Sequence, residues 1–468
     1  MKRILLIISF LLVTFLSGCT LSSTTASTTT LPTLISSTSS SLTTLPSITT
    51  DTLISTSENA EGPTYETLFN NAIKHRFVIS FSQSNFDKLI DDMQNYYDEF
   101  GSYRDNTIQE VDIRYEDSSG SFVELNEVGF RTKGNIFSRV LPVILEDGEV
   151  VGYQQVSFQL EFNDTFDYAE GSTQYKNLKE RRMFDLEQLN FKYIRPDDTG
   201  VVTEMVAYDF FLSIGVPAPQ TSLAIIYFDI DGTLIPYGLF TVTEPLDDVF
   251  ARRVFGKNND GSLGDLYKCV WQEFGPATLK DDYSLSAVGI SDYNDGYRKN
   301  YQLKTNKTIS YQGVEYPRSD FTVFHHFVDQ LNDYSDTLAY QNTLESILDV
   351  DTWLKALAMG FLIGNPDDYR NDANNYYLYF YENQAVYIPF DFDQSLGYGW
   401  NPFEDYGISL DIYDKTISQK YSINQADLVL VNNVLAFEDY QERYENYILE
   451  YTDPETGVFS VQTYLDEF

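Results

Sequence analysis

Cysteine is nearly absent from this sequence, which has only Cys19 and Cys269 among its 468 residues. Two cysteines cannot form the dense disulfide framework that stabilises many small secreted domains. Histidine is scarce as well, and two of the three, His325 and His326, lie in an aromatic run that is typical of packing. A Ser-His-Asp or Cys-His mechanism therefore has little to draw on, and we do not expect histidine catalysis.

Positive charge is also in short supply, because 31 Lys and Arg residues face 70 Asp and Glu residues for a net charge of −39. An acidic surface of this kind argues against nucleic acid or an anionic membrane surface as the partner. Aromatic residues are abundant, with 36 Tyr and 33 Phe. The chain is thus long and apolar enough for one large domain or two ordinary ones.

The N-terminus carries a charged start, residues 1–3, followed by an apolar stretch at 4–16 that is too short to span a bilayer as a mature helix. The stretch ends in Leu16-Ser17-Gly18-Cys19. This ending resembles the bacterial lipobox, in which the cysteine receives lipid and becomes the first mature residue. We expect a lipoprotein signal peptide over 1–18 and a lipid on Cys19. An ordinary secretory signal is the alternative.

The segment from 19 to 64 is dominated by Ser and Thr, with mainly Leu, Ile, Ala and Pro between them in its first part. Such a composition cannot bury enough apolar surface to offset the entropy of ordering, so we expect a disordered tether. Order is expected to begin near Tyr65. Together with the lipid anchor, this predicts a globular domain held on the extracytoplasmic face of the cell membrane.

The globular part is expected to begin with strands and to end mostly in helices. Alternating apolar residues predict strands, and a spacing of three to four predicts helices. A helix over 203–215 is expected to open with a Thr cap and close at Gly215, and Asp231-Gly232 is expected to join the strands 223–228 and 238–243 in a hairpin. The other expected elements are strands at 75–81, 108–115, 122–128, 156–162 and 185–192 and a helix at 85–97. This is an α+β plan with two lobes, an N-lobe at about 65–245 and a C-lobe at about 246–468.

The stretch 360–397 carries the strongest chemical signal. An apolar helix pattern stops at Gly364, a loop rich in Asp and Asn follows, and two aromatic strands at 376–381 and 386–390 lead into Asp391 and Asp393. Period-2 spacing places these two carboxylates on one side of an extended chain. Loop Asp, then Asn, then strand, then Asp is the layout of protein-kinase-like phosphotransferases, in which hard oxygen ligands hold Mg²⁺. Simple turn formation by Asp and Asn is the alternative.

A competing motif lies at 225–234, where Asp229-Ile-Asp231-Gly-Thr matches the signature of haloacid-dehalogenase-type phosphatases. In that chemistry the first Asp is the nucleophile and the second is the general acid, assisted by Mg²⁺. That family needs a long helix after the motif, whereas here the chain returns as a strand after Pro236. We therefore interpret Asp-Gly as a hairpin turn and keep the phosphatase as the weaker alternative.

Several motifs in order resemble those of the spore coat protein H (CotH) kinase family, whose fold is an atypical protein-kinase-like one. They cover roughly residues 75–410, and together their order and spacing are fairly specific. The matching stretches are Arg131-Thr-Lys-Gly-Asn135, the run 204–221, Tyr237-Gly-Leu-Phe followed by Val242-Thr-Glu244-Pro, Leu266-Tyr-Lys268, Gly364-Asn365 with Asp367, Asn374-Asn-Tyr-Tyr-Leu-Tyr379, and Pro389-Phe-Asp391-Phe-Asp393.

The resemblance implies roles for the residues of the loop and the strand end. Asp367 corresponds to the catalytic-loop base, with Asp368 as the fallback. Asn375 and Asp391 would hold Mg²⁺ or Mn²⁺, with Asp393 beside them.

It also implies a set of nucleotide-binding residues. Glu204 would orient a phosphate-binding lysine, Glu244 would lie near the hinge that meets adenine, and Arg131 belongs to the turn that faces phosphate. This sequence departs from many relatives, which carry lysines on the strand after that turn, where it reads Tyr-Gln-Gln-Val-Ser-Phe-Gln-Leu from 153. We expect Lys133 or Lys268 to supply the missing charge.

The sequence thus predicts a surface-anchored, Mg-dependent kinase that transfers the γ-phosphoryl group of ATP to Ser or Thr hydroxyls of a protein. A catalytically inactive kinase-like module for surface display or assembly is the alternative from another class.

Overall fold

The computed structural model describes residues 63–136, 138–195, 201–291, 298–312, 314–397, 399, 411–413 and 423–460. The expected signal peptide, Cys19 and almost all of the expected tether lie outside these residues. Helices and strands both make up large parts of the described chain, which confirms the α+β class.

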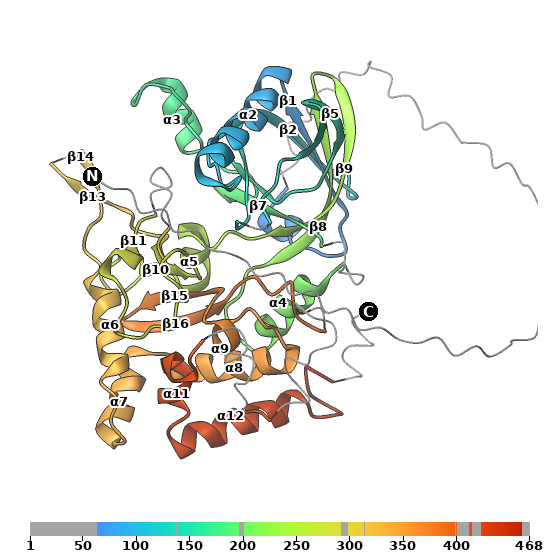
Figure 1. Ribbon diagram of the computed structural model, residues 1–468. Coiled ribbons are helices and arrows are strands. Elements are labelled where there is room, and N and C mark those ends of the chain that lie inside the picture. The colour runs from blue at the N-terminus through green and yellow to red at the C-terminus, as the bar shows by residue number, and fades with distance from the viewer. Residues whose placement is uncertain are drawn as a thin grey trace, which may run out of the picture. The chain divides into compact units, whose positions relative to one another are not determined.

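The first half of the described chain forms a closed barrel (Figure 1). Neighbouring strands are antiparallel except β1 and β8, whose parallel pairing closes the barrel. In barrel order the strands are β1 (His75–Phe81), β2 (Gln109–Asp117), β3 (Phe122–Thr132), β6 (Phe158–Glu161), β7 (Gln188–Tyr193), β9 (Thr233–Thr243) and β8 (Thr221–Ile230).

Aromatic side chains fill the barrel. In β1 every second residue is buried, as the alternation of the sequence predicts. Phe158 stacks on Phe191 with ring centroids 4.6 Å apart, and Phe130 stacks on Phe158 at 5.1 Å. Helix α2 (Gln83–Phe100) covers one side of the barrel and buries Phe86, Leu89 and Met93. The strand expected at 75–81 is present with the same bounds, and the other expected strands and the expected helix at 85–97 are present with shifted ends.

The second half contains a five-stranded sheet packed with helices (Figure 1). Its order is β11 (Val288–Gly289), β12 (Tyr301–Leu303), β10 (Asp265–Cys269), β15 (Tyr376–Tyr381) and β16 (Gln384–Pro389). The associated helices are α5 (Asp248–Phe255), α6 (Thr322–Asn332), α7 (Leu338–Ile347), α8 (Val350–Ile363), α9 (Tyr369–Asp372), α11 (Val429–Val434) and α12 (Glu438–Tyr451).

Smaller elements complete the described chain. They are the helices α1 (Tyr65–Leu68) and α3 (Thr173–Lys179), the hairpins β4 (Val143–Glu146)–β5 (Glu149–Tyr153) and β13 (Thr308–Tyr311)–β14 (Val314–Pro317), and the 3₁₀ turns η1 (Leu285–Ala287) and η2 (Gln425–Asp427).

Helix α4 (Thr203–Ser213) lies between two barrel strands in the sequence but packs with the second half of the chain. Its Ala207, Tyr208 and Phe211 are buried in the same hydrophobic cluster as α6, α8, α11 and α12. The expected Thr cap is wrong, because the N-cap residue is Val202, without a side-chain cap hydrogen bond. The helix stops before Gly215, whose φ of 78° is easy only for glycine.

Candidate active site

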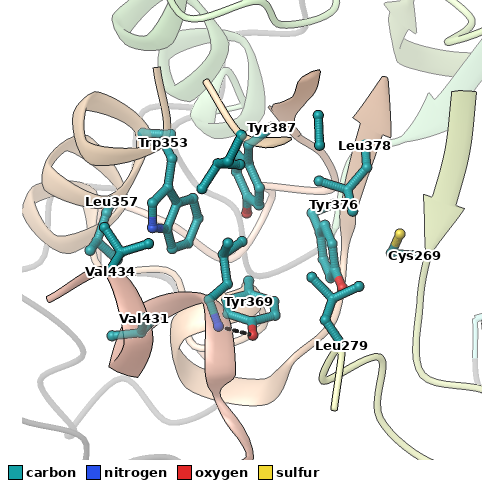
Figure 2. Close-up of a cluster of buried hydrophobic side chains, with 14 of the residues drawn as sticks. Cys269, Leu279, Trp353, Leu357, Tyr369, Tyr376, Leu378, Tyr387, Val431 and Val434 are labelled. Carbon is teal, nitrogen blue, oxygen red and sulfur yellow. Dashed lines mark hydrogen bonds between the residues drawn. The ribbon is translucent and has the colours of Figure 1, made fainter. Parts of the chain in front are cut away.

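The polar loop 364–375 is anchored by a tyrosine. Helix α8 ends as expected at Gly364, which is left-handed with φ 65°. Tyr369 points down from the loop into the apolar cluster, where its hydroxyl accepts from the Leu430 N–H at 3.0 Å (Figure 2) and donates to the Thr278 carbonyl at 2.8 Å. Its ring meets Trp353 edge to face at 5.7 Å. A buried aromatic with a satisfied hydroxyl is a rigid support for a loop.

Asp367 lies in the loop, and each of its two carboxylate oxygens accepts a hydrogen bond from an asparagine side chain. Its Oδ1 accepts from Asn374 Nδ2 at 2.8 Å, and its Oδ2 accepts from Asn375 Nδ2 at 2.9 Å. Burial raises the pKa of Asp367 well above its usual range, and the carboxyl of Asp372 beside it raises it further. Burial likewise raises the pKa of Asp372 to about 7. A raised pKa makes the ionised carboxylate a stronger base than an ordinary one.

Asp368 faces inward and has a structural task. It is 5% exposed, and its Oδ1 accepts the Asn371 N–H at 2.9 Å as the N-cap of α9. Burial raises its pKa to about 6, although the neighbouring Arg370 opposes the shift. The role of Asp368 as the fallback for the catalytic-loop base stays a prediction, although its carboxyl is buried and engaged as a helix cap.

The β15–β16 hairpin delivers Asp391 and Asp393. It turns at Glu382 and Asn383, both with positive φ, as the Glu-Asn-Gln turn predicts. The expectation of an extended chain at the two carboxylates is wrong, because β16 ends at Pro389 and Asp391 has φ 63°. They nevertheless converge, because both contact the ammonium group of Lys192.

Lys192, on barrel strand β7, is the centre of the site. Its Nζ lies 3.0 Å from Glu204 Oε1 and 3.3 Å from Asp393 Oδ2, and it also contacts Asp391 Oδ1. Burial alone would lower the pKa of Lys192, but the three carboxylates raise it well above its usual range. Lys192, Glu204 and Asp393 line one small cavity.

Tyr208 ties the acid on α4 to the strand end. Its hydroxyl donates to Glu204 Oε1 at 3.2 Å and accepts the Asp391 N–H at 2.9 Å. Burial raises the pKa of Glu204 to about 7, with Lys192 opposing. For Asp391, burial acts to raise the pKa, but Lys192, with smaller effects from Lys268 and Arg195, brings it below the usual range. The arrangement concentrates one cation and three carboxylates where barrel and second sheet meet.

The model for "CotH kinase protein" matches residues 131–461 of the chain, which include every residue of this site. The chain belongs to the CotH kinase family. The resemblance inferred from the motifs is thereby confirmed. Among curated proteins, no match was found.

The lysine beside Glu204 is Lys192, whereas Lys133 or Lys268 was expected to supply this positive charge. The strand 185–192 was expected, but its last residue was not recognised as the cation beside Glu204. Lys133 instead donates to the neutral amide of Asn190 at 2.6 Å, and Lys268 lies over the Phe390 ring at 4.4 Å. Neither replaces Lys192 at Glu204. A lysine in an alternating strand shortly before the Glu204 helix was the available signal.

The remaining residues expected to bind nucleotide, Arg131 and Glu244, have partners of their own. Arg131 Nε donates to Glu161 at 2.8 Å. Glu244 is 1% exposed, accepts two hydrogen bonds from Arg253 Nη2 at 2.6 and 2.7 Å, and accepts the Gln220 N–H at 3.2 Å. Its carboxylate is thus paired within the connection between β9 and α5, and the expected place of Glu244 near the hinge that meets adenine stays a prediction.

The phosphatase motif lies where the hairpin pattern predicts. Asp229 pairs with Leu234 in the β8–β9 ladder, and the chain continues directly into β9. Asp229 is therefore not followed by the helix that the phosphatase family needs. Among the described residues, no helix is both long and apolar enough to cross a membrane.

Proposed function

We propose that this protein is a kinase that transfers the γ-phosphoryl group of ATP to Ser or Thr hydroxyls of a protein. The observation that carries the proposal is the ammonium of Lys192, held by Glu204 at 3.0 Å beside Asp391. A strand lysine paired with a helix glutamate, next to a strand-end Asp, is the arrangement that protein kinases require for activity. Family membership supports a phosphotransferase.

Each group has a task in this proposal. Lys192 binds phosphate oxygens of the nucleotide, and Glu204 keeps its side chain in place. Asp367 accepts the proton of the incoming hydroxyl, for which its raised pKa suits it. Asn374 and Asn375 hold the Asp367 carboxylate through both oxygens, so that it points in one direction. Phosphoryl transfer depends chiefly on such positioning and on neutralising charge.

The residues present fit Mg²⁺ or Mn²⁺ bound mainly through the nucleotide. Among the described residues, no cluster of three or more His, Cys, Asp or Glu side chains could hold a metal alone. Mg²⁺ commonly takes one or two carboxylates, with waters and phosphates as the other ligands. Asp391 and Asp393 already converge on one cation, the ammonium of Lys192. These two carboxylates, with Asn375, would hold the metal, which supplies charge neutralisation on the phosphates.

An inactive kinase-like surface module is the second candidate. The observation in its favour is that Lys192 itself neutralises both carboxylates that a metal would need. In this case the same residues would stabilise the fold and bind no nucleotide.

For location, we propose that lipid on Cys19 holds the protein on the extracytoplasmic face of the cell membrane. The support is the sequence alone, since the apolar stretch 4–16 ends directly before Leu-Ser-Gly-Cys. A lipid anchor needs no membrane-spanning helix in the folded domain.

The deciding experiment is calorimetry with Mg-ATP together with transfer of labelled phosphate to a Ser/Thr-rich protein. Asp391→Ala should weaken binding of the metal-nucleotide complex itself. Asp367→Asn should leave binding near that of the wild type while turnover falls by about 10² or more. Asp229→Asn is the matched control and should change neither quantity, whereas loss of a phosphatase activity in this variant would revive the phosphatase. If the wild-type protein binds no nucleotide with Mg²⁺ or Mn²⁺, the kinase proposal is wrong and the inactive surface module takes its place.

A further inference from the structure

A short turn after β10 holds one of the amides that orient Asp367. The turn is closed by two backbone hydrogen bonds between Gln272 and Gly275, at 3.2 and 2.9 Å. At its start, the N–H of Trp271 donates to Asn374 Oδ1 at 2.6 Å. The donor is the backbone N–H of Trp271, so this hydrogen bond does not involve the indole.

This N–H fixes which way the Asn374 amide faces. A primary amide has one acceptor end and one donor end. Because Oδ1 is taken by Trp271, the Nδ2 group points at Asp367 Oδ1, 2.8 Å away. The reversed amide would set its oxygen against the carboxylate and its NH₂ against the N–H, so both contacts would become repulsive. The turn therefore fixes the amide that holds one of the two oxygens of the Asp367 carboxylate.

Side chains from the first half of the chain hold the 271–275 turn in place. Arg104, in the connection between α2 and β2, donates from Nη2 to Glu273 Oε1 at 2.8 Å and from Nη1 to Gln272 Oε1 at 3.4 Å. Arg298 completes the arrangement: its N–H donates to Glu273 Oε2 at 2.9 Å and its Nη2 to the Arg104 carbonyl at 3.0 Å.

This ion pair is better shielded than an ordinary surface pair. The Arg104 and Glu273 side chains are 11% and 24% exposed. Burial alone would raise the pKa of Glu273, but the hydrogen bond from Arg104 brings it below its usual range. A shielded, charge-assisted pair with a second donor on the same turn holds geometry more firmly than an exposed pair does.

We propose that the Arg104–Glu273 ion pair is a clamp by which the barrel sets the position of Asp367, through the 271–275 turn and Asn374. The catalytic part of this inference rests on the proposed function, in which Asp367 is the base. Arg104 is a positioning residue and contacts neither substrate nor nucleotide. Arg104 lies in the connection that leads into barrel strand β2. The clamp therefore makes turnover depend on how the barrel and the second sheet are held together.

The activity test separates turnover from nucleotide binding. In the full-length protein, Arg104→Ala should lower kcat about tenfold while the KM for ATP and the affinity for Mg-ATP stay within twofold of the wild type. Arg104→Lys, which keeps the charge and a donor, should recover most of kcat. Trp271→Ala keeps the backbone N–H and should retain near-normal kcat. Unchanged kcat in Arg104→Ala, or an equal loss in Trp271→Ala, would overturn the clamp.

A second measurement is independent of activity. Hydrogen exchange of the backbone amides at 365–375 should become at least fivefold faster in Arg104→Ala. Arg76→Ala is the matched control, since Arg76 forms a 2.7 Å pair with Glu116 between β1 and β2, and this pair belongs neither to the 271–275 turn nor to the loop. Exchange that is unchanged in Arg104→Ala, or accelerated equally by both variants, would refute the clamp. Absence of turnover in the wild type would count against the kinase alone, because the exchange result still decides the clamp.

Discussion

Lys192 offers the most demanding test, because removing it leaves three carboxylates facing one another. Glu204, Asp391 and Asp393 keep 6%, 35% and 21% of their side chains exposed. Breaking a buried ion pair by removing one partner costs about 3–5 kcal/mol. Asp391 is partly screened by solvent, so for Lys192→Met we expect the lower end, about 3 kcal/mol of unfolding free energy at pH 8.5.

The loss should depend on pH through Glu204. Its folded pKa of about 7 is raised above the ordinary 4.5, so ionisation of Glu204 costs folding stability as the pH rises through that range. Without the lysine its pKa rises further, and the carboxyl stays protonated at pH 6 in the variant. The ammonium itself stays charged from pH 6 to 8.5, since its folded pKa is raised. At pH 6 we therefore expect roughly half of the loss seen at pH 8.5.

Urea unfolding followed by tryptophan fluorescence at the two pH values measures this directly, and ATP turnover should fall by about 10². Lys133→Met is the matched control. Its ammonium contacts a neutral amide, and burial together with Arg131, Lys268 and Lys304 lowers its pKa, so its removal should cost under about 1 kcal/mol. The reasoning fails if Lys192→Met unfolds at the wild-type urea concentration at both pH values, or if Lys133→Met loses as much.

Three further predictions concern other parts of the chain. Asp368→Asn keeps the cap of α9 but removes a carboxyl whose pKa is about 6 in the folded protein against an ordinary 3.8. Ionisation of this carboxyl lowers the stability of the wild type as the pH rises. In urea titrations, the unfolding free energy of the variant relative to the wild type should therefore increase by roughly 2–3 kcal/mol between pH 4 and 7.5. Gly264→Ala should unfold many degrees lower in calorimetry, because a Cβ would lie 2.1 Å from the Phe380 carbonyl oxygen, whereas Gly152→Ala meets only ordinary contacts and should be near neutral. Cys19→Ala should move the protein from the membrane fraction to the medium, and a variant that stays fully membrane-bound would defeat the anchor.

Local patterns carried much of the fold prediction. The hairpin 376–389 follows from two aromatic runs and a short polar turn, and the β8–β9 hairpin follows from Asp231-Gly232, where both residues have positive φ. Such features depend on neighbours in sequence, so propensity and periodicity describe them. The same reasoning separated the hairpin from the phosphatase motif.

Contacts between distant residues were out of reach. Lys192 and Asp391 are 199 positions apart, and nothing near either residue names the other. The order of the second sheet, in which β10 pairs with β15, is equally non-local. The carboxylate pair illustrates a partial success: Asp391 and Asp393 do share a partner, but through a left-handed residue and not through an extended strand. Alternation predicts faces only while the backbone stays extended.

The position of α4 has a consequence for how the chain is made. The helix emerges during synthesis before β8 and β9, yet its apolar residues pack against α8, which begins at Val350, well over a hundred residues later. At ribosomal rates of synthesis, α8 follows α4 after a delay on the order of ten seconds. A fragment that stops near residue 245 would contain every barrel strand but would leave the apolar residues of α4 exposed to solvent. We therefore expect it to aggregate under conditions in which the longer chain does not. Glu204 lies on this helix, 12 positions after Lys192, so we expect the geometry of the pair to become fixed only when α4 has packed against α8.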